Sequence, residues 1–138
     1  MVTTVKVAAA QIRPVLFSLD GSLQKVLDAM AEAAAEGVEL IVFPETFLPY
    51  YPYFSFVEPP VRMGRSHLAL YDQAVVVPGP VTDAVAAAAR QHGMQVLLGV
   101  NERDGGTLYN TQLLFNRCGE IALKRRKITP TYHERMVW

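Results

Sequence analysis

Glu45 is the first residue whose type and position could serve catalysis. It follows an apolar run and a proline in the stretch "LIVFPETF". A carboxylate at the end of a buried strand and beside aromatic rings is partly desolvated, which suits a general base. A capping or solvated glutamate just beyond a strand would give the same local pattern, and the pattern alone favours that simpler interpretation.

Lys127 is the second candidate, at the end of "IALKRRK". Strand periodicity predicts that it shares one face with Ile121, Leu123 and Arg125. A lysine at a strand end can reach into a pocket and stabilise developing negative charge. Such a basic run is more often a solvated edge that discourages strand pairing, and spacing alone favours that interpretation.

Cys118 and His133 are weaker candidates. Cys118 lies in the turn-like "NRCGE", and no histidine is close in sequence to lower its pKa, so we expect an incidental surface cysteine. For His133 a structural role is the simpler interpretation. The aromatic segment "PYYPYF" at residues 49–54 is broken by prolines and could be either a pocket wall or core.

Composition narrows the class of protein. The 138 residues carry 13 Lys and Arg against 13 Asp and Glu, without the basic excess typical of nucleic-acid binding. No apolar run approaches the roughly 20 residues of a membrane span. One cysteine and three scattered histidines form neither a disulfide nor a convincing metal site. We therefore expect a soluble, cytoplasmic chain that binds neither nucleic acid nor membrane.

The hydrophobic pattern predicts the elements that would position these residues, in a single α/β domain with a mixed sheet. Strands 5–12 and 38–45 should be buried on both faces. A helix over 22–37 should be capped by Asp20 or Ser22, with Ala31 on its apolar stripe. The remaining predictions are an irregular helix within 59–75, a helix over 78–93 with Thr82 as its cap, and strands over 94–103, 107–115 and 121–127.

Three motifs together resemble the amino-terminal part of a bacterial or cyanobacterial nitrilase, within the carbon–nitrogen hydrolase superfamily. They are "FPETFLPYYPYF", "LYNTQLLF" and "KRRKITPTYHERMVW", in the family's order. The resemblance implies the amino-terminal part of an αββα sandwich with a mixed sheet and flanking helices. Residues 1–138 would form one incomplete domain, and we expect the inner face of its sheet to be an apolar patch larger than a soluble monomer usually exposes.

The resemblance also implies roles for individual residues. Glu45 matches the general base, Lys127 the lysine that stabilises tetrahedral intermediates, and Glu134 a second glutamate that positions substrate and lysine. Tyr51 and Trp138 match residues that line the substrate pocket. The family's nucleophilic cysteine lies in a "CWE" motif, which we expect beyond residue 138.

The implied activity is hydrolysis of a nitrile to a carboxylic acid and ammonia, without a metal or organic cofactor. The expected partners are a small nitrile, further copies of the protein and the missing carboxyl-terminal part. Two alternatives stay open: a non-catalytic truncated remnant or oligomerisation module, and an amidase or carbamoylase of the same superfamily.

Overall fold

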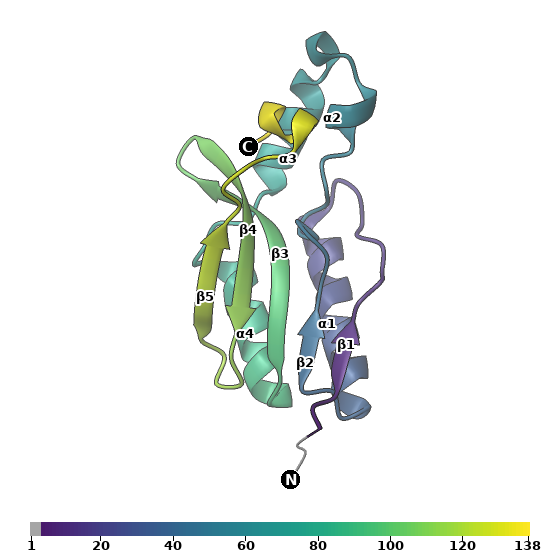
Figure 1. Cartoon of the computed structure of the whole chain (residues 1–138), viewed down its shortest axis with the longest axis vertical. Helices are drawn as coiled ribbons and strands as arrows, with labels where there is room; N and C mark the ends of the chain where they lie inside the picture. The colour runs from purple at the N-terminus through teal and green to yellow at the C-terminus, as the bar shows by residue number, and fades with distance from the viewer. Residues whose placement is uncertain (1–3) are drawn as a thin grey trace.

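The computed structural model describes residues 4–138 and contains one mixed five-stranded sheet in the order β1-β2-β3-β4-β5 (Figure 1). Strands β1 (Val7–Ala9), β2 (Leu40–Val42) and β3 (Gln95–Asp104) are parallel. Strands β4 (Thr107–Phe115) and β5 (Ile121–Arg126) continue as an antiparallel meander. The predicted α/β architecture with a mixed sheet and flanking helices is confirmed.

Two long helices, α1 (Leu19–Ala35) and α4 (Pro80–His92), pack side by side on the same face of the sheet (Figure 1). The main core lies between these helices and the sheet. Three short helical segments follow β2 and gather at one end of the molecule: α2 (Phe54–Val57), the 3₁₀ turn η1 (Pro60–Arg62) and α3 (Gly64–Gln73).

Helix α1 begins at Leu19 because Ser18 caps it. The Ser18 hydroxyl accepts a hydrogen bond from the Gly21 backbone N–H at 3.0 Å. The predicted caps at Asp20 and Ser22 are therefore wrong. Ser22 is fully buried inside the helix, where it lies on the same face as the core residues Val26, Met30 and Ala33. Ala31 is exposed, since it lies about 100° around the helix from Met30.

Helix α4 has Pro80 at its first position, and Gly93 ends it in the left-handed conformation with φ 61°. Both follow the usual preferences at helix ends. Thr82 is not the cap residue: Gly79 is, and the Thr82 hydroxyl accepts a hydrogen bond from the Gly79 N–H at 2.8 Å.

The prediction that the first two strands are covered on both faces is wrong. Val7 of β1 is 54% exposed, because both long helices lie on one side and nothing within residues 4–138 covers the other. One row of residues crosses this open face: Ala9, Val42, Leu97, Leu114 and Leu123 are paired strand to strand. An uncovered apolar sheet face, expected from the resemblance, is thus present in the structure.

Ile121 lies on the opposite face of the sheet from the one predicted, because the last strand pair contains a β-bulge. The register shifts between Leu114 and Phe115, so that Ile121 pairs with Phe115 while Leu123 pairs with Leu114. Ile121 consequently packs against the main core, whereas Leu123 is 45% exposed on the open face.

Gly99 of β3 allows the loop that carries Glu45 to lie directly on the sheet. A Cβ atom at residue 99 would come within 2.4 Å of the Pro44 carbonyl oxygen and 2.5 Å of the Thr46 backbone nitrogen. After this contact the loop bonds to β3, with the Leu48 N–H donating to the Gly99 carbonyl at 3.1 Å. The close approach of this loop to Gly99 therefore determines the position of Glu45.

We predict that Gly99→Ala shifts the 44–46 loop, lowers the free energy of unfolding by about 1–3 kcal/mol and reduces activity, because the new methyl group overlaps backbone atoms. Gly106→Ala is the matched control, since a Cβ there meets nothing within 4 Å. Urea denaturation of the complete protein measures the stability of both variants. Equal stability of the two variants would contradict this account of the loop.

The open face yields a second prediction, for the 138-residue polypeptide expressed alone. It should aggregate, remain molten or pair tightly with another chain, because contiguous apolar patches beyond a few hundred Å² are rare on soluble monomers. Light scattering after size-exclusion chromatography and a thermal melt measure this. A monodisperse monomer with a cooperative melt would show that the face does not need covering.

Candidate active site

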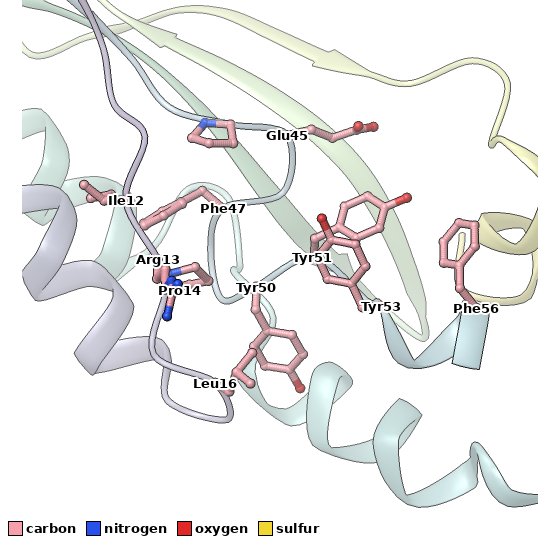
Figure 2. Close-up of a pocket in the computed structure, with 11 residues that line it drawn as sticks. Ile12, Arg13, Pro14, Leu16, Glu45, Phe47, Tyr50, Tyr51, Tyr53 and Phe56 are labelled. Carbon is pink, nitrogen blue, oxygen red and sulfur yellow. The ribbon is translucent and has the colours of Figure 1, made fainter. Parts of the chain in front are cut away.

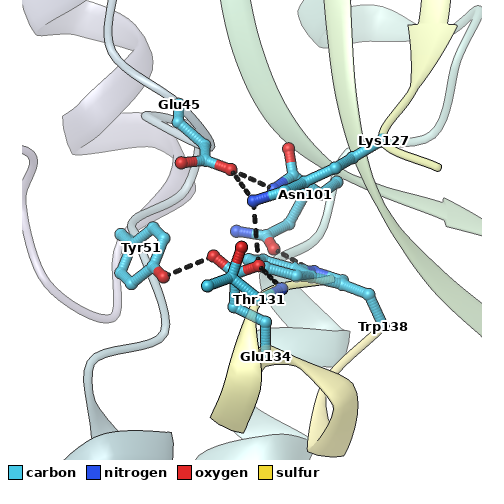
Figure 3. Close-up of polar contacts among 8 residues, drawn as sticks. Glu45, Tyr51, Asn101, Lys127, Thr131, Glu134 and Trp138 are labelled. Carbon is cyan, nitrogen blue, oxygen red and sulfur yellow. Dashed lines mark hydrogen bonds and ion pairs between the residues drawn. The ribbon is translucent and has the colours of Figure 1, made fainter. Parts of the chain in front are cut away.

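The structure brings Glu45, Lys127 and Glu134 together, although 89 positions separate the first from the last in sequence. The Lys127 Nζ donates to Glu45 Oε1 at 2.8 Å and to Glu134 Oε2 at 2.9 Å. Its ammonium group therefore bridges two carboxylates (Figure 3). The three predicted catalytic residues form one connected ionic cluster.

Each member of the cluster comes from a different segment. Glu45 follows β2, in the loop that lies on Gly99. Lys127 follows β5, and its backbone N–H donates to the Asn110 carbonyl at 2.8 Å, one residue beyond the strand's last paired position. Glu134 lies in η2 (Tyr132–Met136), a 3₁₀ turn.

The strand before Lys127 is held by ion pairs to a buried glutamate. Arg126 donates to Glu102 Oε1 at 2.7 Å and to Oε2 at 3.1 Å, and Lys124 also pairs with Glu102. Glu102 is only 1% exposed; burial raises its pKa, but the hydrogen bonds from Arg126, Lys124 and Thr111 outweigh that effect and lower it to about 2. These contacts fix the edge strand from which Lys127 extends.

Glu134 is buried and has donors on both carboxylate oxygens. The Tyr51 hydroxyl donates to Oε1 at 2.6 Å, while Lys127 Nζ and the Thr131 N–H donate to Oε2 at 2.9 and 2.5 Å. Burial raises its pKa, but the hydrogen bonds from Tyr51, Lys127 and the Thr131 backbone lower it by more, so that the net pKa lies below the usual value. An ionised, fully bonded carboxylate is suited to hold other groups in place.

Lys127 and Tyr51 keep their protons in this arrangement. Burial lowers the pKa of Lys127, but hydrogen bonds and charge from Glu45 and Glu134 raise it to a net value above the ordinary one. Burial and the hydrogen bond to Glu134 raise the pKa of the Tyr51 phenol well above its usual value. Lys127 is therefore an ammonium ion that can stabilise negative charge developing nearby.

Sequence reasoning missed Asn101, which connects the loop after Glu45 to the segment that carries Glu134. It is fully buried; its Nδ2 donates to the Tyr50 carbonyl, and its Oδ1 accepts from Trp138 Nε1, both at 2.8 Å. Asn110 was also missed, although its Nδ2 donates to Glu45 Oε1 at 2.6 Å. The available signal was an asparagine within each predicted strand, which needs hydrogen-bond partners if the strand is buried.

A cavity of about 880 Å³ opens beside Glu45 and is largely apolar and aromatic in its lining (Figure 2). The two loops that precede α1 and α2 supply most of the lining, including Ile12, Leu16, Phe47, Tyr51 and Tyr53, and Phe56 of α2 completes it. Tyr51, predicted as a pocket residue, is one of them. Trp138 is not, but its ring meets that of Tyr51 edge-on with centroids 6.0 Å apart.

Cys118 is exposed and far from this cluster. It precedes β5 while Lys127 follows it, and a six-residue strand is about 20 Å long. His133 packs its ring against Phe56 and Tyr132. Within residues 4–138, no group of three His, Cys, Asp or Glu side chains is arranged to hold a metal ion. No helix among those residues is long and apolar enough to cross a membrane.

The lowered pKa of Glu134 predicts how the cluster's stability depends on pH. Its ionised form stabilises the fold above the unfolded value of about 4.5, and this contribution is lost as pH falls through the lower folded pKa. Glu134→Gln should therefore be less stable than the wild type at pH 7, and the difference should shrink below pH 4.5. Denaturant unfolding of the complete protein from pH 7 to pH 3 measures it.

Glu120→Gln serves as the control for this titration, because Glu120 lies in an exposed turn and accepts one amide hydrogen bond from Asn116. It should change stability little across the same range. A stability difference for Glu134→Gln that is independent of pH would contradict the assignment of an ionised, buried Glu134.

Comparison with known proteins identifies the family of this chain. The carbon-nitrogen hydrolase family model matches residues 6–138. A nitrilase from Paraburkholderia phymatum is 63% identical over 134 residues, covering 97% of this chain and 39% of the relative. An aliphatic nitrilase from Rhodococcus rhodochrous is 40% identical over 136 residues, covering 98% of this chain and 37% of the relative.

Solved structures show the same fold. An amidase from Nesterenkonia sp. superposes with a TM-score of 0.70 at 17% identity, over 97% of this chain and 47% of the amidase. The chain spans about two fifths of the length of the curated nitrilases that it matches. Because the family model covers nearly all of it, the chain belongs to the carbon–nitrogen hydrolase family.

Proposed function

We propose that the complete protein is a nitrilase, which hydrolyses a nitrile to a carboxylic acid and ammonia. Glu45, Lys127 and Glu134 would act from this chain, and the nucleophile would be a cysteine outside residues 1–138. The observation that carries the proposal is the Lys127 ammonium between two carboxylates, beside an apolar cavity. Similarity to proteins named nitrilases, at 63% and 40% identity, supports the nitrile as substrate class.

In the proposed first step, Glu45 takes the proton of the cysteine thiol. The thiolate electron pair forms a C–S bond to the nitrile carbon, one C–N π bond breaks, and the nitrogen takes up the proton held by Glu45 to give a thioimidate. An ordinary thiol, with a pKa of about 8.5, is mostly protonated at neutral pH, so the base is needed.

Two waters complete the proposed reaction. The first adds to the thioimidate carbon, and the C–N bond then breaks to release ammonia and leave a thioester. The second attacks the thioester, and cleavage of the C–S bond releases the acid and restores the thiol. Lys127 would stabilise the charge of each tetrahedral intermediate, and Glu134 would keep Lys127 in place. No step requires a metal ion or an organic cofactor.

The cavity supports a nitrile with an apolar substituent. Its aromatic and aliphatic walls would desolvate such a group, while the charged cluster lies at one side, where Glu45 lines the same cavity. The rest of the protein, or further copies of it, would supply both the nucleophile and a cover for the open sheet face.

The test is activity of the complete protein on a panel of aliphatic and aromatic nitriles and their amides, with ammonia, acid and amide quantified. Glu45→Gln and Lys127→Ala should each lower nitrile turnover by at least about a thousandfold, because they remove proton transfer and charge stabilisation. Cys118→Ser should stay within about twofold of the wild type, because Cys118 is exposed and remote.

Loss of activity in Cys118→Ser would overturn the assignment of the nucleophile to another cysteine. Full activity of Glu45→Gln would refute the proposed base. Turnover of amides with no turnover of any nitrile would replace the nitrilase with an amidase of the same family.

A further inference from the structure

The two oxygens of the Glu45 carboxylate differ in their contacts. Oε1 accepts two hydrogen bonds, from Lys127 Nζ at 2.8 Å and from Asn110 Nδ2 at 2.6 Å. Oε2 accepts none from residues 4–138, and in Figure 3 both dashed lines from Glu45 leave the same oxygen. With two donors already on Oε1, Oε2 is the oxygen with free capacity to accept a proton.

Asn110 is placed to maintain this difference. It lies within β4, where it pairs with Asn101 of β3, and it is only 8% exposed. Its carbonyl oxygen accepts the backbone N–H of Lys127 at 2.8 Å. Because a carboxylate can only accept, the amide nitrogen of Asn110 must face Glu45, which fixes the orientation of the amide. One rigid residue thus contacts both the side chain of Glu45 and the backbone of Lys127.

The Glu45 side chain needs such a constraint, because 45% of it is exposed and the terminal torsion of a glutamate is broad. An ammonium ion offers three donors, and an unconstrained carboxylate can turn both of its oxygens toward Lys127. That geometry would occupy the oxygen required for proton transfer. The Asn110 contact holds Oε1 in place and leaves Oε2 directed away from the lysine.

We propose that Asn110 is a positioning residue that makes Oε2 of Glu45 the proton-accepting atom of the site. The inference rests on the proposed function, since it assigns the thiol proton to one oxygen of the proposed base. Asn110 does not act on the substrate itself. Its effect passes through Glu45, so its loss should slow the chemical step without weakening substrate binding.

The experiment compares Asn110→Asp and Asn110→Ala with the wild type in the complete protein, using steady-state kinetics on its best nitrile. Asp keeps the shape but replaces the N–H donor with an acceptor, and Ala removes the group. Loss of a hydrogen bond to a charged group predicts a fall in kcat of roughly 10- to 100-fold, with KM within about twofold. The larger loss should belong to Asn110→Asp, whose carboxylate faces that of Glu45.

Asn116→Asp is the matched control. The Asn116 amide also donates to a glutamate, Glu120 Oε2, at 2.8 Å, but in the exposed turn at the far end of β5. The same substitution there should leave kcat unchanged. Thermal melts of all variants show whether each is folded, and if Asn110→Asp does not fold, Asn110→Ala decides the question.

A folded Asn110 variant with kcat within about twofold of the wild type overturns the inference, as does a loss confined to KM. Glu45→Gln, measured alongside, distinguishes failure of the role of Asn110 from failure of the proposed function. If Glu45→Gln is inactive while the Asn110 variants are fully active, only the role of Asn110 fails. If Glu45→Gln is itself active, the proposed function fails.

Discussion

The Lys127 ammonium lies between the carboxylates of Glu45 and Glu134, and the proposed chemistry depends on this contact. Both contacts are shorter than 3 Å, yet the two carboxylates differ in environment. Glu134 is buried with every oxygen bonded, whereas the Glu45 side chain is about half exposed beside the cavity. One carboxylate therefore fixes the lysine, and the other stays available to the cavity.

Residues at the centre of the sheet hold the segments of this cluster in position. Gly99 admits the Glu45 loop, Asn101 connects that loop to Trp138, and Asn110 connects Glu45 to Lys127. All three residues lie on the face of β3 and β4 opposite the long helices. The same face is apolar and uncovered farther along the strands, so the polar site and the open surface belong to one side of the sheet.

The sequence predicts the elements well where the pattern is long and regular, as in α4, where Pro80 and Gly93 mark both ends. It fails where tertiary contacts decide. The bulge in the pairing of β4 with β5, for example, moves Ile121 to the other face of the sheet. The cap of α1 is a local error, because the Ser18 hydroxyl bonds to Gly21 only three residues ahead. Glu45, Lys127 and Glu134 were found through the resemblance, because periodicity alone favoured solvated roles for the first two. Asn101 and Asn110 were missed because an asparagine in a strand shows a need for hydrogen-bond partners but not which distant residues supply them.

We propose that this chain supplies the base and the lysine, and that a cysteine elsewhere in the complete protein supplies the nucleophile. The most direct measurement is peptide mapping by mass spectrometry of the complete protein, acid-quenched during turnover of a nitrile. We expect an acyl or thioimidate adduct on a cysteine outside residues 1–138. An adduct on Cys118, or turnover with no cysteine modified, would contradict it.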